Sequence, residues 1–498
     1  MKLYRLSQTS HYAFHRTLVQ TISSAIRRRG LLTLAIETSC DDTAVAIVEK
    51  NGAAARLHFN QRITADQGPL LGIHPIVALE GHEKTLAGLL NQALPYLPRP
   101  AIPANGYNSS TRCIEISEKD GSSSLRKAPD FISVTRGPGM RTSLNTGLHT
   151  AKGLSVAWQV PLVGVHHMQA HALTSRLVNA LDAELPGKAD FPNTNLSPKP
   201  EFPFLSLLVS GGHTLLVRSE DLVTHKILAN TGDYAIGDCL DKIGRFLLPE
   251  ELIASSKTPS YGPILEKFAF PNGSSDYSYD PPKSLSEERA RAKRPTSYGW
   301  YITLPLAISR AGSRLNIPEF SFTGIESQAQ RIAERGWDKA LSKWSKQNRT
   351  SLMPEAEARC LAQETMKVAF GQIASRIVLA LEEEKSHGSS PSKTLVLSGG
   401  VASNKFLRYV IQQLLRARGF GHIEICAPPI ALCTDNAAMI GWAGCEMYEA
   451  GHISSLGIRV LGKWSMENIV SPENEIDGRG WIENNLKSPS VHKPSVPS

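Results

Sequence analysis

A short apolar run followed by Ser-Gly-Gly occurs twice in this chain, and this repeated turn is the feature that most constrains its fold. The first copy is "FLSLLVSGGHTLLVRS" at residues 204–219, and the second is "TLVLSGGVASN" at residues 394–404. Apolar runs of about five residues are typical of buried strands. Glycines directly after such strands let the backbone bend sharply and expose amide N–H groups, which suit a bound phosphate. For either copy alone, an ordinary turn between strands is the simpler interpretation.

The strand, polar turn, strand pattern of the first copy also occurs near the start of the chain. In "LLTLAIETSCDDTAVAIVEKNGAAARLHFNQ", at residues 31–61, the polar turn contains Asp41 and Asp42. Two such hairpins indicate a duplicated α/β domain, in which each copy presents one turn to the same bound phosphate. Helical apolar spacing at residues 75–96 and 142–157 predicts helices that cover the first sheet.

The net charge of +8 is concentrated at the start of the chain. Residues 1–36 contain six basic residues and no acidic residue, so removing these charges leaves only +2 for the remainder. The apolar side chains of this segment recur every four residues, at Phe14, Leu18, Ile22 and Ile26. An amphipathic, basic and acid-free segment is typical of a mitochondrial transit peptide, which we expect at residues 1–30 of a protein of the mitochondrial matrix. The alternative is a basic arm that stays attached and binds RNA.

The composition predicts a soluble enzyme without a membrane span or a disulfide framework. The 498 residues are 41% hydrophobic and 20% charged, and no apolar run approaches the roughly 18 residues of a membrane-spanning helix. The seven cysteines are scattered without a Cys-x-x-Cys pair, which argues against a zinc ribbon and for reduced thiols. Three polar stretches, at residues 103–128, 180–202 and 270–297, are rich in turn-forming residues and are expected to be mobile insertions.

The sequence "GVHHMQAHALTSRL" places His167 and His171 one helical turn apart. Both imidazoles would then project from one face of a helix, where they could bind one divalent metal ion. Because the chain contains 15 histidines, a structural pair that arose by chance is the alternative. Met168 and Gln169 stand where a zincin motif needs its general-base glutamate, which argues against metal-assisted peptide hydrolysis.

Other polar motifs have both a functional and a structural interpretation. The "RGPGM" motif at residues 136–140 lies between a predicted strand and a predicted helix, where backbone amides could hold an anion or form a plain turn. Asp238 and Asp241 lie on a predicted helix, either as solvated acids or as groups that face a hydroxyl or a metal. Asp435 precedes a run of small, apolar residues. It could be a helix N-cap or a buried ligand there.

Eight motifs of this chain occur in the order that is typical of one enzyme family. They are "IETSCDDTAVAIV", "GPGMRTSLNTGLHTAKGL", "HHMQAH", "FPFLSLLVSGGHTLLV", "DCLDKIGR", "FSFTGIES", "LSGGVASNKFLR" and "CTDNAAMIGWAG". From residue 31 to residue 444, apart from the three polar stretches, the chain therefore resembles the tRNA threonylcarbamoyladenosine synthases. With its N-terminal segment, it is similar to the mitochondrial branch of that family.

The resemblance implies an α/β fold of the actin, Hsp70 and sugar-kinase type, in which two duplicated lobes close over a nucleotide. The first lobe would span residues 31–152 and be completed by a segment near residues 425–465. The second lobe, with the polar insertions, would span residues 153–424. Residues 466–498 would form a C-terminal extension with a disordered tail.

The resemblance also implies a reaction. Members of the family transfer a threonylcarbamoyl group from threonylcarbamoyl-AMP to N6 of adenosine 37, in tRNAs that read codons starting with A, and release AMP. A separate synthase would supply the threonylcarbamoyl-AMP, and mitochondrial tRNA would accept the group. The enzyme would be a homodimer with one divalent metal ion per subunit, iron or zinc in the first place and magnesium as the alternative.

Matching the motifs residue by residue assigns ligands by resemblance. His167, His171 and Asp435 correspond to the metal ligands of the family. The segment that wraps the adenylate corresponds to Leu208, Val209, Ser210, Gly211 and Gly212.

The remaining family positions concern the nucleoside and the proton. Asp241 and Gly262 match positions that hold the ribose, and Asn404 matches one near the adenine. The proton of the attacking amine could pass to a leaving phosphate oxygen or to a carboxylate, for which Asp41 is the candidate catalytic residue.

The chain departs from the family pattern at four places. Asp42 and Asp238 stand where glutamates are usual, Tyr261 stands where a glycine is usual, and the two residues at 169–170 are Gln-Ala instead of Glu-Gly. Because of these departures, a non-catalytic nucleotide-binding scaffold is one alternative function. An ATPase or small-molecule kinase is the other, since fold alone does not separate it from a tRNA-modifying enzyme.

A protein with so little net charge outside its first residues needs a local basic patch to bind tRNA. The first candidate is "QRIAERGWDKALSKWSKQNRT" at residues 330–350, where cations recur at roughly helical spacing with Trp337 and Trp344 among them. Its basic residues are Arg331, Arg335, Lys339, Lys343, Lys346 and Arg349. A solvated helix face is the alternative interpretation. "SEERARAKRP" at residues 286–295 is the second candidate patch.

Overall fold

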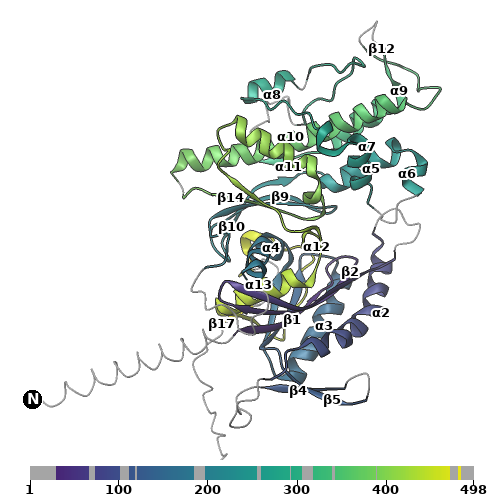
Figure 1. Cartoon of the computed structure of the whole chain (residues 1–498). Helices are drawn as coiled ribbons and strands as arrows, with labels where there is room; N and C mark the ends of the chain where they lie inside the picture. Colours follow the sequence, from purple (N-terminus) through teal and green to yellow (C-terminus); the bar gives the residue numbers. More distant parts are fainter. Residues whose placement is uncertain are drawn as a thin grey trace, which may run out of the picture.

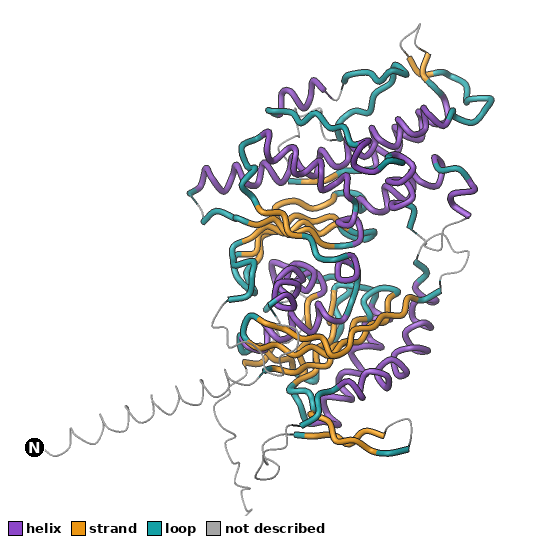
Figure 2. Tube along the Cα trace, in the orientation of Figure 1, coloured by secondary structure: helices purple, strands orange, loops and turns teal. Residues whose placement is uncertain are grey.

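Two β-sheets form the centre of the molecule, with helices on the outer face of each sheet and further helices between them (Figure 1). The computed structural model describes residues 30–66, 73–100, 112–117, 121–183, 197–254, 260–291, 293–305, 318–338, 343–388, 390–471 and 481–483. The alternation of helical and extended segments along these ranges is visible in Figure 2.

The first sheet has seven strands in the order β17-β16-β7-β6-β1-β2-β3. These strands are β1 (Leu31–Glu37), β2 (Asp42–Asn51), β3 (Ala54–Thr64), β6 (Phe131–Gly137), β7 (Leu162–His166), β16 (His452–Ser454) and β17 (Trp481–Glu483). A separate two-stranded hairpin consists of β4 (Cys113–Ser117) and β5 (Ser123–Lys127).

The second sheet has six strands in the order β11-β10-β9-β8-β14-β15. These strands are β8 (Phe204–Val209), β9 (Thr214–Ser219), β10 (His225–Thr231), β11 (Glu319–Phe320), β14 (Thr394–Ser398) and β15 (Glu424–Cys426). Another two-stranded hairpin consists of β12 (Trp337–Asp338) and β13 (Lys343–Trp344).

The two sheets repeat one connectivity. In the first, β1 pairs antiparallel with β2, β2 pairs antiparallel with β3, and β1 is parallel to β6, which is parallel to β7. In the second, β8, β9 and β10 repeat the antiparallel series, and β8 is parallel to β14, which is parallel to β15. The topology therefore confirms the expected duplicated α/β fold of two lobes.

Helices cover both faces of each sheet. In chain order the α-helices are α2 (Pro75–Ala93), α3 (Arg141–Trp158), α4 (His167–Asp182), α5 (Ile236–Leu247), α6 (Glu250–Ala254), α7 (Gly262–Ala269), α8 (Leu285–Arg291), α9 (Thr323–Arg335), α10 (Glu355–His387), α11 (Lys405–Ala417), α12 (Ile430–Cys433) and α13 (Ala437–Glu449). Single 3₁₀ turns are η1 (Leu94–Tyr96), η2 (Gly273–Asp276), η3 (Gly400–Ser403) and η4 (Met466–Asn468). None of the helices in the described ranges is long and apolar enough to cross a membrane.

Alternation along β1 explains the layers around the first sheet. Leu34 and Ile36 belong to the core formed with α2 and α3, whereas Ala35 faces the opposite core, which contains α4 and α13. Small residues let α13 approach the sheet closely, because a Cβ atom on Gly441 would lie 2.5 Å from Cγ2 of Val48. Helices α4 and α13 thus lie between the two sheets, where α4 also contacts β8 and β14.

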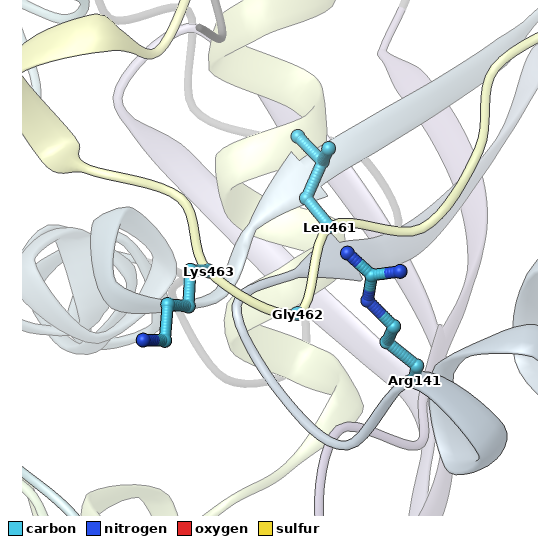
Figure 3. A pocket seen from close by; sticks show the side chains of 4 residues that line it. All are labelled: Arg141, Leu461, Gly462 and Lys463. Carbon is cyan, nitrogen blue, oxygen red and sulfur yellow. The ribbon is translucent and has the colours of Figure 1, made fainter. Parts of the chain in front are cut away.

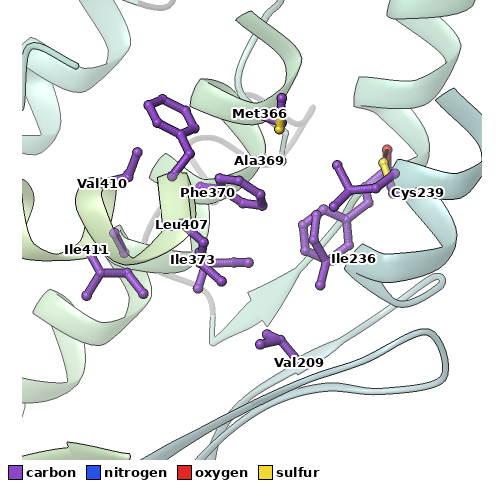
Figure 4. Close-up of a cluster of buried hydrophobic side chains, with 14 of the residues drawn as sticks. Val209, Ile236, Cys239, Met366, Ala369, Phe370, Ile373, Leu407, Val410 and Ile411 are labelled. Atoms are coloured by element: carbon purple, nitrogen blue, oxygen red, sulfur yellow. Dashed lines mark hydrogen bonds between the residues drawn. The ribbon is translucent and has the colours of Figure 1, made fainter. Parts of the chain in front are cut away.

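The outer face of the second sheet carries the largest apolar core. Side chains from α5, α10 and α11 converge on the strands there, as Figure 4 shows for Ile236, Phe370 and Leu407 beside Val209. All four of these side chains are fully buried. This core fixes α5 and α11. The N–H of Gly237, in the first turn of α5, donates to the carbonyl of Ser210 directly after β8, at 3.2 Å, and α11 follows β14 after the single turn η3.

The structure agrees with some of the expected elements and corrects others. Helices α2 and α3 confirm the helices predicted at residues 75–96 and 142–157. The stretch at 103–128 was expected to be a mobile insertion. Its described part forms the β4–β5 hairpin, and Ile116 of β4 packs into the core between the first sheet and helices α2 and α3. The boundary expected after residue 152 falls inside α3, and β7 then joins the first sheet. The expected transit peptide, apart from residue 30, and most of the expected tail lie outside the described residues.

The helix expected across residues 330–350 is also corrected. Helix α9 ends at Arg335, and Gly336 follows with a φ of +76°, a conformation that favours glycine and stops a helix. The described chain continues into β12 and β13 instead. Among the described residues, Arg331 and Arg335 therefore lie on α9, whereas Lys343 belongs to β13 and Lys346 and Arg349 follow it.

Candidate functional site

His167, His171 and Asp435 meet between the two sheets. Helix α4 begins at His167 directly after β7, and Asp435 lies just before Asn436, the N-cap of α13. The Nε2 atoms of His167 and His171 lie 3.5 Å and 3.1 Å from Oδ1 of Asp435. One ligand atom from each of the three residues lies within 4.8 Å of the others, so they could hold one metal ion.

A carboxylate from the first lobe orients His167. Glu37, the last residue of β1, is fully buried and lies 3.1 Å from Nδ1 of His167 through Oε2. It also accepts hydrogen bonds from the backbone N–H of Ser39, at 2.5 Å, and from the hydroxyl of Thr135. A neutral His167 that donates Nδ1–H to Glu37 would turn the lone pair of Nε2 toward Asp435, which is the arrangement that a metal-binding histidine needs.

A hydroxyl from the second lobe contacts the other histidine. Ser398, the last residue of β14 and the first of the second Ser-Gly-Gly turn, lies 3.3 Å from Nδ1 of His171. Ser39 likewise lies 3.2 Å from Nδ1 of His167. Residues of the first lobe thus contact Nδ1 of His167, and a residue of the second lobe contacts Nδ1 of His171. The cluster therefore depends on both sheets.

The charges around the cluster favour a cation. Burial alone would lower the pKa of His167, but the carboxylates of Glu37 and Asp435 outweigh it and raise the pKa to about 9. Burial alone would raise the pKa of Asp435, but His167 and His171 hold it well below the ordinary range. Two carboxylates therefore stabilise positive charge at His167, which fits a divalent ion in place of a proton.

The first Ser-Gly-Gly turn is open on one side. Leu208 and Val209 have fully buried side chains, so only their backbone atoms could contact a ligand. The hydroxyl of Ser210 accepts hydrogen bonds from the backbone N–H groups of Gly212, at 3.3 Å, and His213, at 3.1 Å. A Cβ atom on Gly211 or Gly212 would meet nothing within 4 Å, so space for a ligand lies beside both glycines.

The two Ser-Gly-Gly turns lie side by side at one edge of the second sheet. Strands β8 and β14 are parallel neighbours, and Leu208 is in register with Ser398. Gly399 has a φ of +93°, and a Cβ atom there would lie 2.3 Å from the carbonyl oxygen of Val209. Packing therefore requires a glycine at position 399 in the second turn, whereas the first turn has free space beside its glycines.

The other residues assigned by resemblance fix the helices around this edge. Oδ1 of Asp241 accepts hydrogen bonds from the backbone N–H groups of Tyr261, at 2.7 Å, and Gly262, at 3.0 Å, and burial raises the pKa of this carboxyl. Oδ1 of Asn404 accepts one from the N–H of Leu407, at 2.9 Å, as the N-cap of α11. Asp241 thereby connects α5 to the start of α7.

Asp41 lies half-buried in the turn between β1 and β2. Its neighbour Asp42 is the first residue of β2, and burial raises its pKa to about 6 despite a hydrogen bond from Thr64 and the charge of Arg62. Arg62 in turn donates to the carbonyl oxygen of Asp435, at 3.3 Å. The Asp at position 42 is thereby linked to the cluster through Arg62.

Two other departures have structural explanations. Gln169 is fully buried, and its side-chain amide donates to the carbonyl of Leu222, at 2.8 Å, away from the histidine pair. Asp238 forms a surface ion pair with Lys242, at 3.0 Å.

Sequence reasoning missed Glu37, Ser39 and Ser398. A signal existed for Glu37, because a glutamate ends the otherwise apolar run "LLTLAIE". Such a residue is expected to be buried and paired. The sequence pattern does not reveal that the partner of Glu37 is His167.

A model of the TsaD family, described as tRNA N6-adenosine threonylcarbamoyltransferase, matches residues 122–442. The mitochondrial tRNA N6-adenosine threonylcarbamoyltransferase of Schizosaccharomyces pombe is 32% identical over 466 residues, which cover 91% of this chain and 90% of the relative. The tRNA N6-adenosine threonylcarbamoyltransferase of Brucella suis is 29% identical over 446 residues, which cover 88% of this chain and 96% of the relative.

Two solved structures share sequence identity of 12% with this chain. HypF of T. kodakarensis has a TM-score of 0.40, covering 85% of this chain and 48% of its own. Component A of the (R)-2-hydroxyglutaryl-CoA dehydratase of Acidaminococcus fermentans has a TM-score of 0.34, covering 84% and 97%.

Proposed function

We propose a specific reaction for this chain, which belongs to the tRNA N6-adenosine threonylcarbamoyltransferase family and is a transferase. The chain transfers the threonylcarbamoyl group of threonylcarbamoyl-AMP to N6 of adenosine 37, in tRNAs that read codons starting with A. The observation that carries the proposal is the contact between the metal-ligand cluster and the paired Ser-Gly-Gly turns, through His171 and Ser398. An adenylate phosphate beside the glycines would lie next to the cluster.

In this proposal His167, His171 and Asp435 hold one divalent ion, iron or zinc in the first place. When bound, the ion would polarise the phosphate or the carbamoyl carbonyl and offset negative charge as AMP leaves. Glu37 and Ser398 keep the two imidazoles oriented for this role, because each contacts an Nδ1 atom.

The second lobe would bind the adenylate. Backbone atoms of residues 208–212 surround the phosphate, and the absence of side chains at Gly211 and Gly212 lets the phosphate approach. Asp241, held by the loop at Gly262, would accept a hydrogen bond from a ribose hydroxyl through its second oxygen. Asn404 would face the adenine from the start of α11.

No covalent intermediate with the protein is needed, because the adenosine amine attacks the carbamoyl carbon directly. The amine then loses a proton, and the C–O bond to the phosphate breaks as AMP leaves. Asp41 is the candidate acceptor of that proton, with a phosphate oxygen of the leaving AMP as the alternative.

The first residues and a relative support a mitochondrial setting for the proposed reaction. The S. pombe relative is a mitochondrial enzyme by its name, and residues 1–36 contain basic and no acidic residues. We therefore place the reaction in the mitochondrial matrix, with tRNA there as acceptor, a separate synthase as the source of threonylcarbamoyl-AMP, and a homodimer as the active form. A reporter fused to residues 1–35 should enter mitochondria, and a diffuse cytosolic signal would contradict the assignment.

The reaction is tested by incubating the purified protein with threonylcarbamoyl-adenylate and unmodified tRNA. Nuclease digestion and mass spectrometry should detect threonylcarbamoyladenosine at position 37, and light scattering should detect a dimer. Absence of this nucleoside with metal-loaded protein would contradict the proposal. ATP hydrolysis without tRNA would instead favour the ATPase alternative, and nucleotide binding without turnover would favour the scaffold.

A further inference from the structure

In each of the two stretches expected to bind tRNA, one arginine is already paired with carboxylates in the folded chain. Arg349 forms an ion pair with Glu357, at 2.7 Å, which neutralises one end of the stretch at 330–350. In the stretch at 286–295, Arg291 pairs with Glu287 and with Asp280. Phosphates would have to compete with these carboxylates for the same guanidinium groups.

Two other segments combine basic residues with a complete absence of acidic ones. Residues 131–181 and residues 450–466 contain no aspartate or glutamate. Their basic residues are Arg136, Arg141, Lys152, Arg176, Arg459 and Lys463. The segments meet in space, because the N–H of Leu461 donates to the carbonyl of Arg136, at 2.9 Å, and the N–H of Gly139 donates to the carbonyl of Gly462, at 3.3 Å.

A cavity lies where these segments meet. It has a volume of about 360 Å³ and is lined by Arg141, Leu461, Gly462 and Lys463 (Figure 3). Arg141 and Lys463 are exposed, and within the described ranges neither pairs with a carboxylate. A Cβ atom on Gly462 would lie 3.1 Å from Nε of Arg141, so the glycine lets the arginine lie against the backbone of the cavity wall.

Short contacts connect both walls of the cavity to the residues around the start of α4. Met140, next to Arg141, donates its N–H to the carbonyl of Ser39, at 2.9 Å, and Ser39 contacts His167. Trp464, next to Lys463, has its carbonyl oxygen 3.1 Å from Nε2 of His166. Arg141 is therefore next to a residue that contacts Ser39, and Lys463 is next to a residue that contacts His166.

We propose that Arg141 and Lys463 bind backbone phosphates of the tRNA, close to the adenosine that receives the group. This inference rests on the proposed function, because it assigns the acceptor RNA to one side of the same site. An arginine and a lysine that pair with no carboxylate among the described residues suit a phosphate, which arginine can bind through two parallel N–H groups. The adenylate phosphate has its own place at the glycine turn of the second lobe, so the first-lobe cavity is left for RNA.

The contact would position the tRNA and carry no sequence preference. Phosphate contacts fix the register of a nucleic acid on a protein, whereas base edges specify sequence. A phosphate held at this cavity would place a neighbouring nucleotide near the start of α4, where the cluster lies. It would also explain how a chain with little net charge outside its first residues attracts tRNA locally.

The test compares two double variants of the full-length protein. In Arg141→Gln with Lys463→Gln both cavity cations are neutral, whereas Lys84→Gln with Lys385→Gln removes the same charge from exposed positions on α2 and α10. Affinity for unmodified tRNA is measured by fluorescence anisotropy at several salt concentrations, and KM is measured for tRNA and for threonylcarbamoyl-adenylate. We expect the cavity variant to bind tRNA roughly tenfold more weakly, with the slope of log Kd against log salt lower by about 1 to 2. The control should stay within about twofold of the unaltered protein.

Each outcome decides the inference. An unchanged tRNA affinity and salt slope in the cavity variant would overturn it, as would a raised KM for the adenylate with an unchanged KM for tRNA. Thermal unfolding checks the fold, and if the double variant is unfolded, the single change Lys463→Gln should still lower the salt slope by about 1. Absence of product with the unaltered protein would contradict the proposed function, while the binding measurement would still decide this inference.

Discussion

The turn after β1 and the turn after β8 occupy equivalent places in the two lobes, but they contain different chemistry. The first turn follows a buried carboxylate, Glu37, and includes Ser39, which contacts a candidate metal ligand. The second turn consists of Ser210, Gly211 and Gly212 and has open space beside its glycines. In the first lobe the turn is part of a polar network, and in the second it is a backbone surface.

The difference shows how the two lobes of a duplicated fold can take different roles in one binding site. A carboxylate in the second turn would repel a phosphate, and glycines in the first would leave His167 without its partner. The two lobes meet at the histidine pair, which Glu37 contacts from one side and Ser398 from the other. We therefore expect substitutions in the first lobe to affect the metal ion, and substitutions in the second to affect the adenylate or the stability of the lobe.

The largest effect is expected where the lobes meet. Changing His167 and His171 together to Ala should remove the metal ion and lower kcat/KM on the order of a thousandfold, because the ion would supply several kcal/mol of charge stabilisation. Elemental analysis and the transfer assay measure both quantities. His149→Ala on the exposed face of α3 is the matched control. Full metal occupancy in the double variant would show that the histidines are structural.

Glu37→Gln tests the first lobe alone. Losing the charge that orients His167 should weaken metal binding by roughly 10- to 100-fold, with a partial return of activity at high metal concentration. A purely structural role would not respond to added metal. Asp238→Asn, which removes an exposed carboxylate, is the control and should leave metal affinity unchanged.

A pair of glycine substitutions tests the second lobe. Gly211→Ala should leave the free energy of unfolding nearly unchanged and raise KM for the adenylate roughly tenfold, because its Cβ atom would enter the space left for the ligand. Gly399→Ala should instead destabilise the protein by about 1–3 kcal/mol, since the residue has a positive φ and its Cβ atom would collide with a backbone carbonyl. Denaturant unfolding and adenylate kinetics separate the two effects. If Gly211→Ala destabilised the protein as much as Gly399→Ala, the proposed difference between the two turns would be wrong.

Sequence alone predicted the parts of this site that depend on local spacing. The four-residue spacing of His167 and His171 indicated a shared helical face, and repeated apolar runs indicated the duplicated sheets. The contact between Glu37 and His167 joins residues 130 positions apart, so no local pattern contains it. Arg141 and Lys463 also come together only because the segment at 459–463 pairs with the end of β6. The sequence pattern shows that such segments lack acids, but not that they meet.

The smallest effect concerns Asp42, a second carboxylate at the first-lobe turn. Burial raises the pKa of Asp42 to about 6, above the value of about 4 for an unfolded chain. The folded state therefore binds this proton more tightly, so the carboxyl lowers the free energy of unfolding as the pH rises from about 4 to about 6.

Asp42→Asn removes that penalty and should raise the free energy of unfolding by about 1–2 kcal/mol at pH 8, with little change near pH 3. Denaturant unfolding at both pH values measures the difference, and Asp238→Asn serves as the exposed control. A loss of stability at both pH values would mean that the contacts of Asp42 with Arg62 and Thr64 outweigh the cost of its burial. The first-lobe turn would then use this carboxylate as a structural partner of Arg62, which contacts the backbone of Asp435.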